Sequence, residues 1–231
     1  MSTPSKGYVR SVIDMDCDLI LPCRNEGPAL PSLLASVPAG LRVIVVDNGS
    51  ADDTAEVARS LGAMVVSEPR PGYGAAVHAG VMASSAEYVA VADGDGSFDL
   101  SDLLPMLDVV RRAEADMAVG RRRPTTSGTW PWHARTGNAL IVAWLRRRIG
   151  MSVNDIAPMR VCRRADLVDL GVEDRRFGYP VELLQRATLA GWRLSEHDVA
   201  YGPRAAGTRS KVSGSVTGTM KTAHDFWRVL A

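Results

Sequence analysis

The chain has 231 residues, of which 46% are hydrophobic and 23% charged, with a formal net charge of +1. This is the composition of a soluble globular protein, and one α/β domain can be this long. The nearly balanced charge argues against a general nucleic-acid binder, because such domains are strongly basic, so we expect no nucleic-acid partner.

The N-terminal segment MSTPSKGYVR lacks the apolar core of a signal peptide. No apolar run approaches the roughly 18 residues that span a bilayer. The three cysteines, at positions 17, 23 and 162, form no CxxC pair, which predicts free thiols and no zinc site. We therefore expect a cytoplasmic protein, and a peripheral contact with the inner face of a membrane is left open.

Five segments rich in β-branched residues predict strands. They cover residues 18–22, 41–47, 63–68, 87–93 and 115–120. The stretches between the first four of them favour helices, at 29–37, 50–62 and 74–85. In the second helix Ser50 and Asp53 have the spacing of a capping box, and Gly62 suits its end.

Short apolar strands that alternate with helices predict a parallel sheet covered on both faces, with its site beyond the carboxyl ends of the strands. Polar residues follow every predicted strand. In chain order they are Arg24, Asn25 and Glu26, then Asp47 and Asn48, then Arg70, then Asp93 and Asp95, and finally Arg121. We expect these side chains to converge on one edge of the sheet.

The pattern changes from about residue 128. A helix is predicted over 130–150, a short segment at 154–160, a helix over 179–191 and a strand over 193–201. A basic tail rich in Gly and Ser follows. There is no linker and no internal repeat, so residues 1–231 are expected to form a single domain.

Asp93 and Asp95 raise the question of why carboxylates follow a buried strand. A calcium loop is disfavoured, because its sixth and twelfth positions hold Phe98 and Leu104 instead of Gly and Glu. A phosphatase-like Asp-x-Asp nucleophile resembles the haloacid dehalogenases, whose motif ends the first strand, not the fourth. The pair instead suits one divalent ion that keeps open positions for substrate phosphates. A solvated helix start remains the interpretation for Asp99 and Asp102.

At this point the chain resembles a known family, the inverting family 2 glycosyltransferases of GT-A fold, and within it the branch similar to dolichyl-phosphate mannose synthase. The resemblance covers about residues 18–212. It rests on LPCRNE, VIVVDNGSADDT, RPGYGAAVHAG, VADGDGSFD, VGRR, the Arg and Gly-Asn of 135–138, NDIAPMR, FGYPVELLQRA and YGPRAAGTRSKVSG. It implies a Rossmann-like α/β domain with a mostly parallel central sheet and helices on both faces.

The resemblance also implies a division of labour. About residues 18–127 would bind the nucleotide sugar, and about 128–231 would supply the acceptor side and a closing loop. The residues matched to nucleotide-sugar binding are Pro22, Asn25, Glu26, Asp47, Arg70, Gly72, Asp93, Ser210 and Lys211. Asp93 and Asp95 match the ligands of Mg2+ or Mn2+, Arg121 and Arg135 match the acceptor-phosphate positions, and Arg204 opens the loop that closes over the diphosphate. Ser97 stands where the family usually has a longer ligand such as Gln.

The implied activity is transfer of a hexose from a nucleotide sugar of the GDP-mannose or UDP-glucose type to a polyprenyl or dolichyl phosphate. The alternative keeps this donor with a soluble alcohol or a phosphorylated small molecule as acceptor. A phosphate monoester is already anionic and needs no base, whereas an alcohol does. The arginines at 121, 122, 123 and 135 are a plausible cradle for such a phosphate. With an alcohol acceptor, Asp155 and Glu182 are the candidate bases, each with a structural ion pair as its competing interpretation. The candidate catalytic residues are therefore Asp95, Asp155, Glu182, Arg121 and Arg204. Trp130 and Trp132 are expected to form an apolar lid or anchor, with contact to the acceptor left open.

Overall fold

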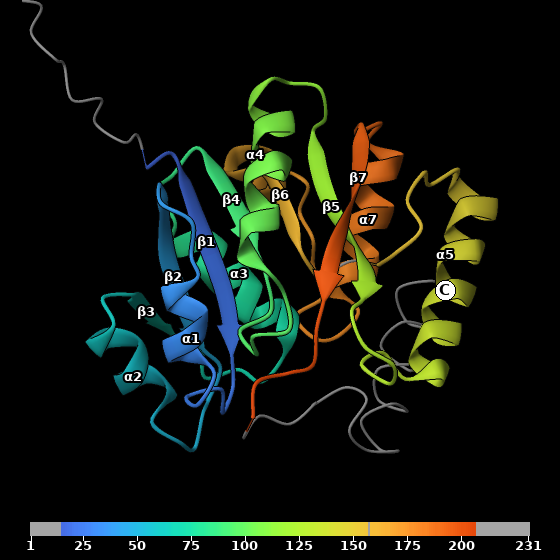
Figure 1. The fold of residues 1–231 in the computed structure, drawn as a ribbon. Helices are drawn as coiled ribbons and strands as arrows, with labels where there is room; N and C mark the ends of the chain where they lie inside the picture. The colour runs from blue at the N-terminus through green and yellow to red at the C-terminus, as the bar shows by residue number, and fades with distance from the viewer. Residues whose placement is uncertain (1–14, 157, 207–231) are drawn as a thin grey trace, which may run out of the picture.

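The computed structural model describes residues 15–156 and 158–206, and its strands form one sheet in the order β3-β2-β1-β4-β6-β5-β7 (Figure 1). The strands are β1 (Cys17–Cys23), β2 (Leu41–Asp47), β3 (Met64–Ser67), β4 (Tyr88–Val91), β5 (Met117–Pro124), β6 (Arg160–Arg163) and β7 (Leu194–Tyr201). Neighbouring strands are parallel except at β6, which runs antiparallel to both β4 and β5. The predicted mostly parallel sheet of a single α/β domain is thus confirmed.

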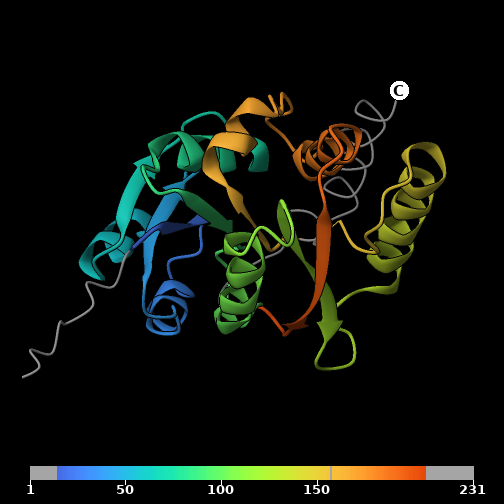
Figure 2. The same ribbon diagram turned by 90° about the horizontal axis from the view of Figure 1, so that it is seen from above.

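Helices cover both faces of the sheet, as Figure 2 shows from above. They are α1 (Leu30–Ala35), α2 (Thr54–Ser60), α3 (Tyr73–Ala83), α4 (Leu103–Arg111, preceded by the 3-10 turn η1, Leu100–Asp102), α5 (Trp132–Ile149), α6 (Arg164–Asp169) and α7 (Tyr179–Leu189). Helices α3, α5, α6 and α7 pack on one face, and α1, α2 and α4 pack on the other.

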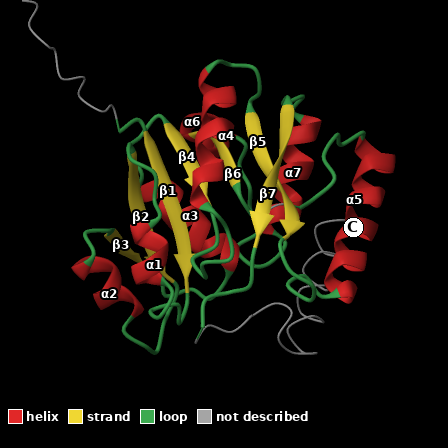
Figure 3. Ribbon diagram, in the orientation of Figure 1, coloured by secondary structure: helices red, strands yellow, loops and turns green. Residues whose placement is uncertain are grey.

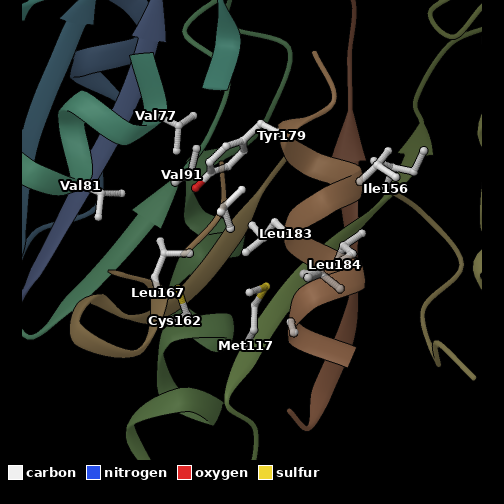
Figure 4. Packing of buried hydrophobic residues seen from close by; sticks show 14 of the residues in the cluster. Val77, Val81, Val91, Met117, Ile156, Cys162, Leu167, Tyr179, Leu183 and Leu184 are labelled. Atoms are coloured by element: carbon white, nitrogen blue, oxygen red, sulfur yellow. The ribbon is translucent and has the colours of Figure 1, made fainter. Parts of the chain in front are cut away.

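The central strands are apolar on both sides because both faces are covered. In β1, Leu19 and Leu21 belong to the core under α1 and α4, whereas Ile20 belongs to the core under α3. On the face covered by α3, α5, α6 and α7, side chains of α7 such as Leu183 pack against Met117 of β5 (Figure 4). A methyl group on Gly80 of α3 would lie 2.4 Å from Ile20, so this helix approaches the sheet closely.

The five strands expected in the first half are all present, and the expected strand over 193–201 is β7. Strand β6 is an addition, because the sequence indicated only a short segment over 154–160. The predicted capping box is wrong: α2 begins at Thr54, and its N-cap, Asp53, makes no side-chain capping bond. Ser50 instead accepts a hydrogen bond from the backbone N–H of Asn25, 3.0 Å away.

The parallel strands place their carboxyl ends at one edge, where Figure 3 shows the arrowheads of β1, β5 and β7 followed by loops. These loops carry the polar residues of the predicted site. Ser210 and Lys211 lie outside the described residues. Within the described ranges, no helix has the length and apolar character needed to cross a membrane.

Candidate active site

A pocket opens at this carboxyl edge. Its walls come from the ends of β1 and β4, the start of α3, the segment before α7 and the segment after β7. The predicted site residues that line it are Pro22, Glu26, Gly72, Asp93, Asp95 and Arg204. Residues spread over the first half of the chain therefore meet Arg204 from the second half.

Asp93 and Asp95 form the acidic wall of the pocket. Burial raises the pKa of Asp93 to about 6, and the neighbouring Asp95 carboxylate contributes to this rise. The guanidinium groups of Arg204, Arg122 and Arg160 oppose it. Asp95 is only 2% exposed, and its Oδ1 accepts a hydrogen bond from the backbone N–H of Ser97 at 2.9 Å.

These acids fit a divalent cation that is shared with a substrate. Within the described ranges, no group of three His, Cys, Asp or Glu side chains could enclose a metal ion alone. Two buried carboxylates leave coordination positions for phosphate oxygens and water, as Mg2+ and Mn2+ prefer. The Oγ of Ser97 is buried beside them and has no hydrogen-bond partner in the described structure. A hard cation would relieve both the carboxylate repulsion and this unmet oxygen.

Arg204 brings positive charge to the same wall. Its Nη1 lies 2.6 Å from Oδ2 of Asp95, whose side chain is 3% exposed. The backbone N–H of Ala205 donates to the carbonyl of Asp95 at 3.0 Å, and that of Gly202 donates to the carbonyl of Ser97 at 2.8 Å. The segment after β7 is therefore docked on the loop that carries the acids.

The turn after β1 is held by the loop after β2. Asn25 has a left-handed backbone (φ 53°), and its Oδ1 accepts the N–H of Ala51 at 2.7 Å. The N–H groups of Glu26 and Gly27 donate to Oγ1 of Thr54 at 3.0 and 2.9 Å. Asp47 accepts the N–H of Ser50 at 3.1 Å. Asn25 and Asp47 thus support the turn and are not among the residues that line the pocket.

Asn48, which was expected at this edge of the sheet, organises the next wall. Its Nδ2 donates to the carbonyls of Glu68 (2.8 Å) and Arg70 (2.7 Å), and its Oδ1 accepts the N–H of Gly72 (2.9 Å). The guanidinium of Arg70 points to Glu68, with Nη2 2.8 Å from Oε2, and lowers the pKa of Glu68 to about 2. Arg70 itself does not line the pocket, although its backbone shapes it.

Gly72 and Gly74 are required by close backbone contact, beyond the tight turn that they form. A Cβ on Gly72 (φ 151°) would lie 2.1 Å from the carbonyl oxygen of Arg175. The N–H of Gly74 donates to the carbonyl of Arg176 at 3.0 Å. Glu182 holds this opposing loop, because its carboxylate accepts the N–H groups of Glu173 (3.0 Å) and Asp174 (2.6 Å).

Glu182 also pairs with Arg186, with Nε 2.6 Å from Oε1. Its carboxylate is therefore engaged on three sides, and it is not among the residues that line the pocket. A role as general base stays a prediction, and this geometry weighs against it.

Arg121 and Arg122 project to opposite faces of β5, as neighbours on a strand must. Arg121 pairs with Asp198 of β7, with Nε 2.6 Å from Oδ1. Arg122 instead donates to Asp155 from its backbone N–H (2.9 Å), Nε (3.0 Å) and Nη2 (2.6 Å). Its charge also acts on the pKa of Asp93, so Arg122 is the one that faces the acids.

Aromatic rings hold Arg122 in this place. Its guanidinium carbon lies 4.0 Å from the ring centre of Trp130 and 5.9 Å from that of Tyr201. Trp132, by contrast, is 78% exposed and does not cover the site. Arg135 is exposed on the first turn of α5, one turn before Asn138, whose Oδ1 lies 3.3 Å from Nη2 of Arg122.

Comparison with known families identifies the fold and the chemistry together. The model of the family described as Glycosyl transferase family 2 matches residues 18–165, which include all but the first residue of β1, the acid pair and β6. The chain belongs to glycosyl transferase family 2. The family prediction and the prediction of an enzyme are confirmed.

Relatives within family 2 are similar over most of their length. An uncharacterised glycosyltransferase of Mycobacterium tuberculosis is 56% identical over 92% of this chain and 97% of its own. A dolichyl-phosphate hexose transferase of Haloferax volcanii is 31% identical over 84% of this chain and 86% of its own. A polyprenol monophosphomannose synthase of Mycolicibacterium smegmatis is 30% identical over 85% of this chain and 81% of its own.

Among solved structures, the glucosyl-3-phosphoglycerate synthase of Mycobacterium tuberculosis has the same GT-A fold. Its complex with phosphoglyceric acid superposes with a TM-score of 0.71 at 20% identity, covering 99% of this chain and 85% of that one. Its complex with Mn2+, UDP-glucose and phosphoglyceric acid gives a TM-score of 0.70 at 19% identity, covering 98% and 84%.

Against this family 2 background, the sequence missed a residue that lines the pocket. Tyr73 was not assigned to the site, whereas Asn48 was expected at this edge and Arg122 was expected only as one of several arginines on the acceptor side. Strand alternation could have favoured Arg122 over Arg121 if the register of β5 had been known. Nothing in the local sequence indicates that Tyr73 lines the pocket.

Proposed function

We propose that the chain transfers a hexose from a nucleoside-diphosphate sugar to the phosphate of a polyprenyl phosphate, with inversion at the anomeric carbon. The observation that carries this proposal is the engagement of Asp155 by Arg122. An alcohol acceptor would require a carboxylate that is available as a base. Asp155 instead binds the Arg122 guanidinium, which is suited to a phosphate acceptor.

The donor half of the proposal rests on the lining of the pocket. Pro22 and Glu26, from β1 and the turn after it, and Gly72, which precedes α3, would border the nucleotide. The loops that carry them would be fixed by Asn25, Asp47 and Arg70. Asp93 and Asp95 would hold Mg2+ or Mn2+, which neutralises the diphosphate and stabilises it as leaving group when bound. The solved neighbour in complex with Mn2+ and UDP-glucose supports this assignment by analogy of fold.

Arg204 would stabilise the same leaving group from the other side. Its guanidinium already lies within 2.6 Å of Asp95, so a short swing about its side chain would bring it to a diphosphate. A bidentate cation at a departing diphosphate lowers the energy of the transition state in which charge develops. Ser210 and Lys211 are proposed to complete this loop.

The acceptor half of the proposal rests on Arg122 and on the relatives. A phosphate monoester has a second pKa of about 6 and reaches the site already ionised, so no protein base has to remove a proton. Arg122, rather than Arg121, is proposed to meet that phosphate, and Arg135 lies one turn from the residue that Arg122 contacts. The relatives named as dolichyl-phosphate hexose transferase and polyprenol monophosphomannose synthase support a lipid phosphate.

A soluble phosphorylated acceptor is the second candidate, because the solved neighbours bind phosphoglyceric acid. The two candidates share the phosphate and differ in what it is attached to. A transfer assay with polyprenyl phosphate, unphosphorylated polyprenol and 3-phosphoglycerate separates them, with UDP-glucose or GDP-mannose as donor and Mn2+ present. We expect product only with polyprenyl phosphate. Product with 3-phosphoglycerate alone would establish the soluble acceptor, and product with polyprenol would contradict the absence of a base.

A further inference from the structure

Arg160, the first residue of β6, carries a buried charge whose hydrogen bonds are not satisfied. The residue is 2% exposed, and its Nε and Nη1 have no hydrogen-bond partner in the described structure. Its Nη2 donates to the carbonyl of Ile156, at 3.3 Å. A guanidinium stays charged at any physiological pH, and a buried charge without partners is costly. Such a group calls for a ligand or ordered water.

The strand register places Arg160 beside the acids. It pairs with Val91, the last residue of β4, and Asp93 follows two residues later. Arg160 shares its face of β6 with Cys162, which packs in the cluster that also contains Val91 and Tyr179 (Figure 4). Its charge also acts on the pKa values of Asp93 and Tyr179. The guanidinium is not among the groups that line the pocket, but it lies close to Asp93 and Tyr73, which do.

Tyr73 offers a second unmet group at the same place. This first residue of α3 lines the pocket, and its buried hydroxyl lies beside the Arg160 side chain without a hydrogen bond of standard geometry to any described group. Burial raises the pKa of Tyr73 to about 12, and the charge of Arg160 opposes that rise. Its ring meets that of Tyr179 edge-on, with centroids 6.4 Å apart, so the hydroxyl is held in position.

We propose that Arg160 and Tyr73 form the subsite that recognises hydroxyl groups of the donor's sugar. The inference rests on the proposed function and names residues that set its sugar specificity. Arg160 offers N–H donors, the Tyr73 hydroxyl can donate or accept, and the Asp93 carboxylate accepts. Hydroxyl groups on adjacent ring carbons both donate and accept, so a sugar ring matches this mixed set. An apolar group would leave all three unsatisfied, and an unshielded anion would face Asp93.

The test compares binding of donors with and without their sugar. Tyr73→Phe removes one hydroxyl, and Arg160→Met removes the buried charge while keeping an unbranched side chain. Calorimetric titrations with Mn2+ would use UDP against UDP-glucose, and GDP against GDP-mannose. For the pair that the wild type binds, we expect the nucleotide sugar to bind each variant about tenfold more weakly, because sites built on hydrogen bonds discriminate strongly. Affinity for the nucleoside diphosphate should stay within about twofold.

Tyr88→Phe is the matched control, because its hydroxyl contacts Arg163 at the far end of β4. It should leave both affinities unchanged. Equal losses for the nucleoside diphosphate and the nucleotide sugar would place Arg160 on the diphosphate and overturn the inference, as would unchanged sugar binding in Tyr73→Phe. Tyr73→Phe keeps the test decisive if Arg160→Met does not fold. A wild type that binds neither nucleotide sugar would contradict the proposed function itself, and the inference with it.

Discussion

Arg204 and Asp95 form an ion pair of 2.6 Å at one wall of the pocket, between the segment after β7 and the loop after β4. The backbone reinforces this side-chain pair, since Ala205 N–H bonds to the carbonyl of the same aspartate. The Arg204 guanidinium thus contacts a carboxylate oxygen that a divalent metal would need. The position of Arg204 and metal binding should therefore be linked through this single carboxylate.

Arg204→Gln should therefore have opposite effects on metal binding and on transfer. Without nucleotide, the variant should bind Mn2+ a few-fold more tightly, because no guanidinium competes for Asp95. Transfer should fall by about a hundredfold, since the leaving diphosphate loses a charged donor. Free Mn2+ measured by electron paramagnetic resonance and the rate of sugar transfer give the two readouts. Arg123→Gln, which loses an exposed pair with Asp198, is the control, and weaker Mn2+ binding in Arg204→Gln would contradict the link.

Asp93→Asn should stabilise the metal-free protein at neutral pH while it abolishes transfer. The pKa of Asp93 is raised from 3.8 to about 6, so its contribution to stability is full below pH 3.8 and is lost as pH rises through 6. The shift corresponds to on the order of 3 kcal/mol. Urea unfolding in EDTA at about pH 4.5 and about pH 7 should show that wild type loses stability relative to Asp93→Asn. If the free energy of unfolding had the same pH dependence in both proteins, burial of the ionised Asp93 would not be destabilising.

Gly74→Ala should destabilise the protein by about 1–3 kcal/mol, the usual cost of overpacking. A Cβ there would lie 2.5 Å from the carbonyl oxygen of Asp174 and 2.8 Å from Cβ of Tyr179. Gly137→Ala is the matched control, since Gly137 is also helical and has nothing within 4 Å of its added Cβ. That change should be neutral or stabilise by up to about 1 kcal/mol. The midpoints of urea unfolding should be lower for Gly74→Ala than for Gly137→Ala, and similar midpoints would refute the packing argument.

Asp155→Asn separates a positioning role from general-base catalysis. If Asp155 orients Arg122, the variant should raise the KM for the acceptor about tenfold, consistent with weakened charge-assisted hydrogen bonds, with a smaller change in kcat. If Asp155 were the base, kcat would fall by about a hundredfold or more and the acidic limb of the pH profile would vanish. Initial rates from about pH 5.5 to about pH 9 with polyprenyl phosphate distinguish these outcomes.

The sheet and the acid pair could be predicted because both arise from local pattern. Strands β1, β2 and β4 are short apolar runs, and the loops that leave the carboxyl edge of a parallel sheet lie close together. Asp93, Asp95 and Glu26 accordingly meet in one pocket with Arg204. These residues could be placed at the pocket from the sequence because the course of the backbone is enough to bring their loops together.

Side-chain direction and long-range partners could not be read in this way. Arg121 and Arg122 are neighbours with the same chemistry, and only the pairing of β5 with β7 shows which one faces Asp155. Glu182 resembles a candidate base until the loop that it caps is seen. Arg160 opens a four-residue strand with charged ends, so neither β6 nor the burial of this guanidinium has a local signal.

A single transfer assay tests the proposed activity and its dependence on the acid pair. Labelled sugar from GDP-mannose or UDP-glucose is followed into the organic phase with polyprenyl phosphate, for wild type, wild type in EDTA, and Asp95→Ala. We predict transfer by wild type with Mg2+ or Mn2+ and none in EDTA or in the folded Asp95→Ala variant. Full transfer by Asp95→Ala, or transfer unaffected by EDTA, would contradict the proposed metal-dependent mechanism.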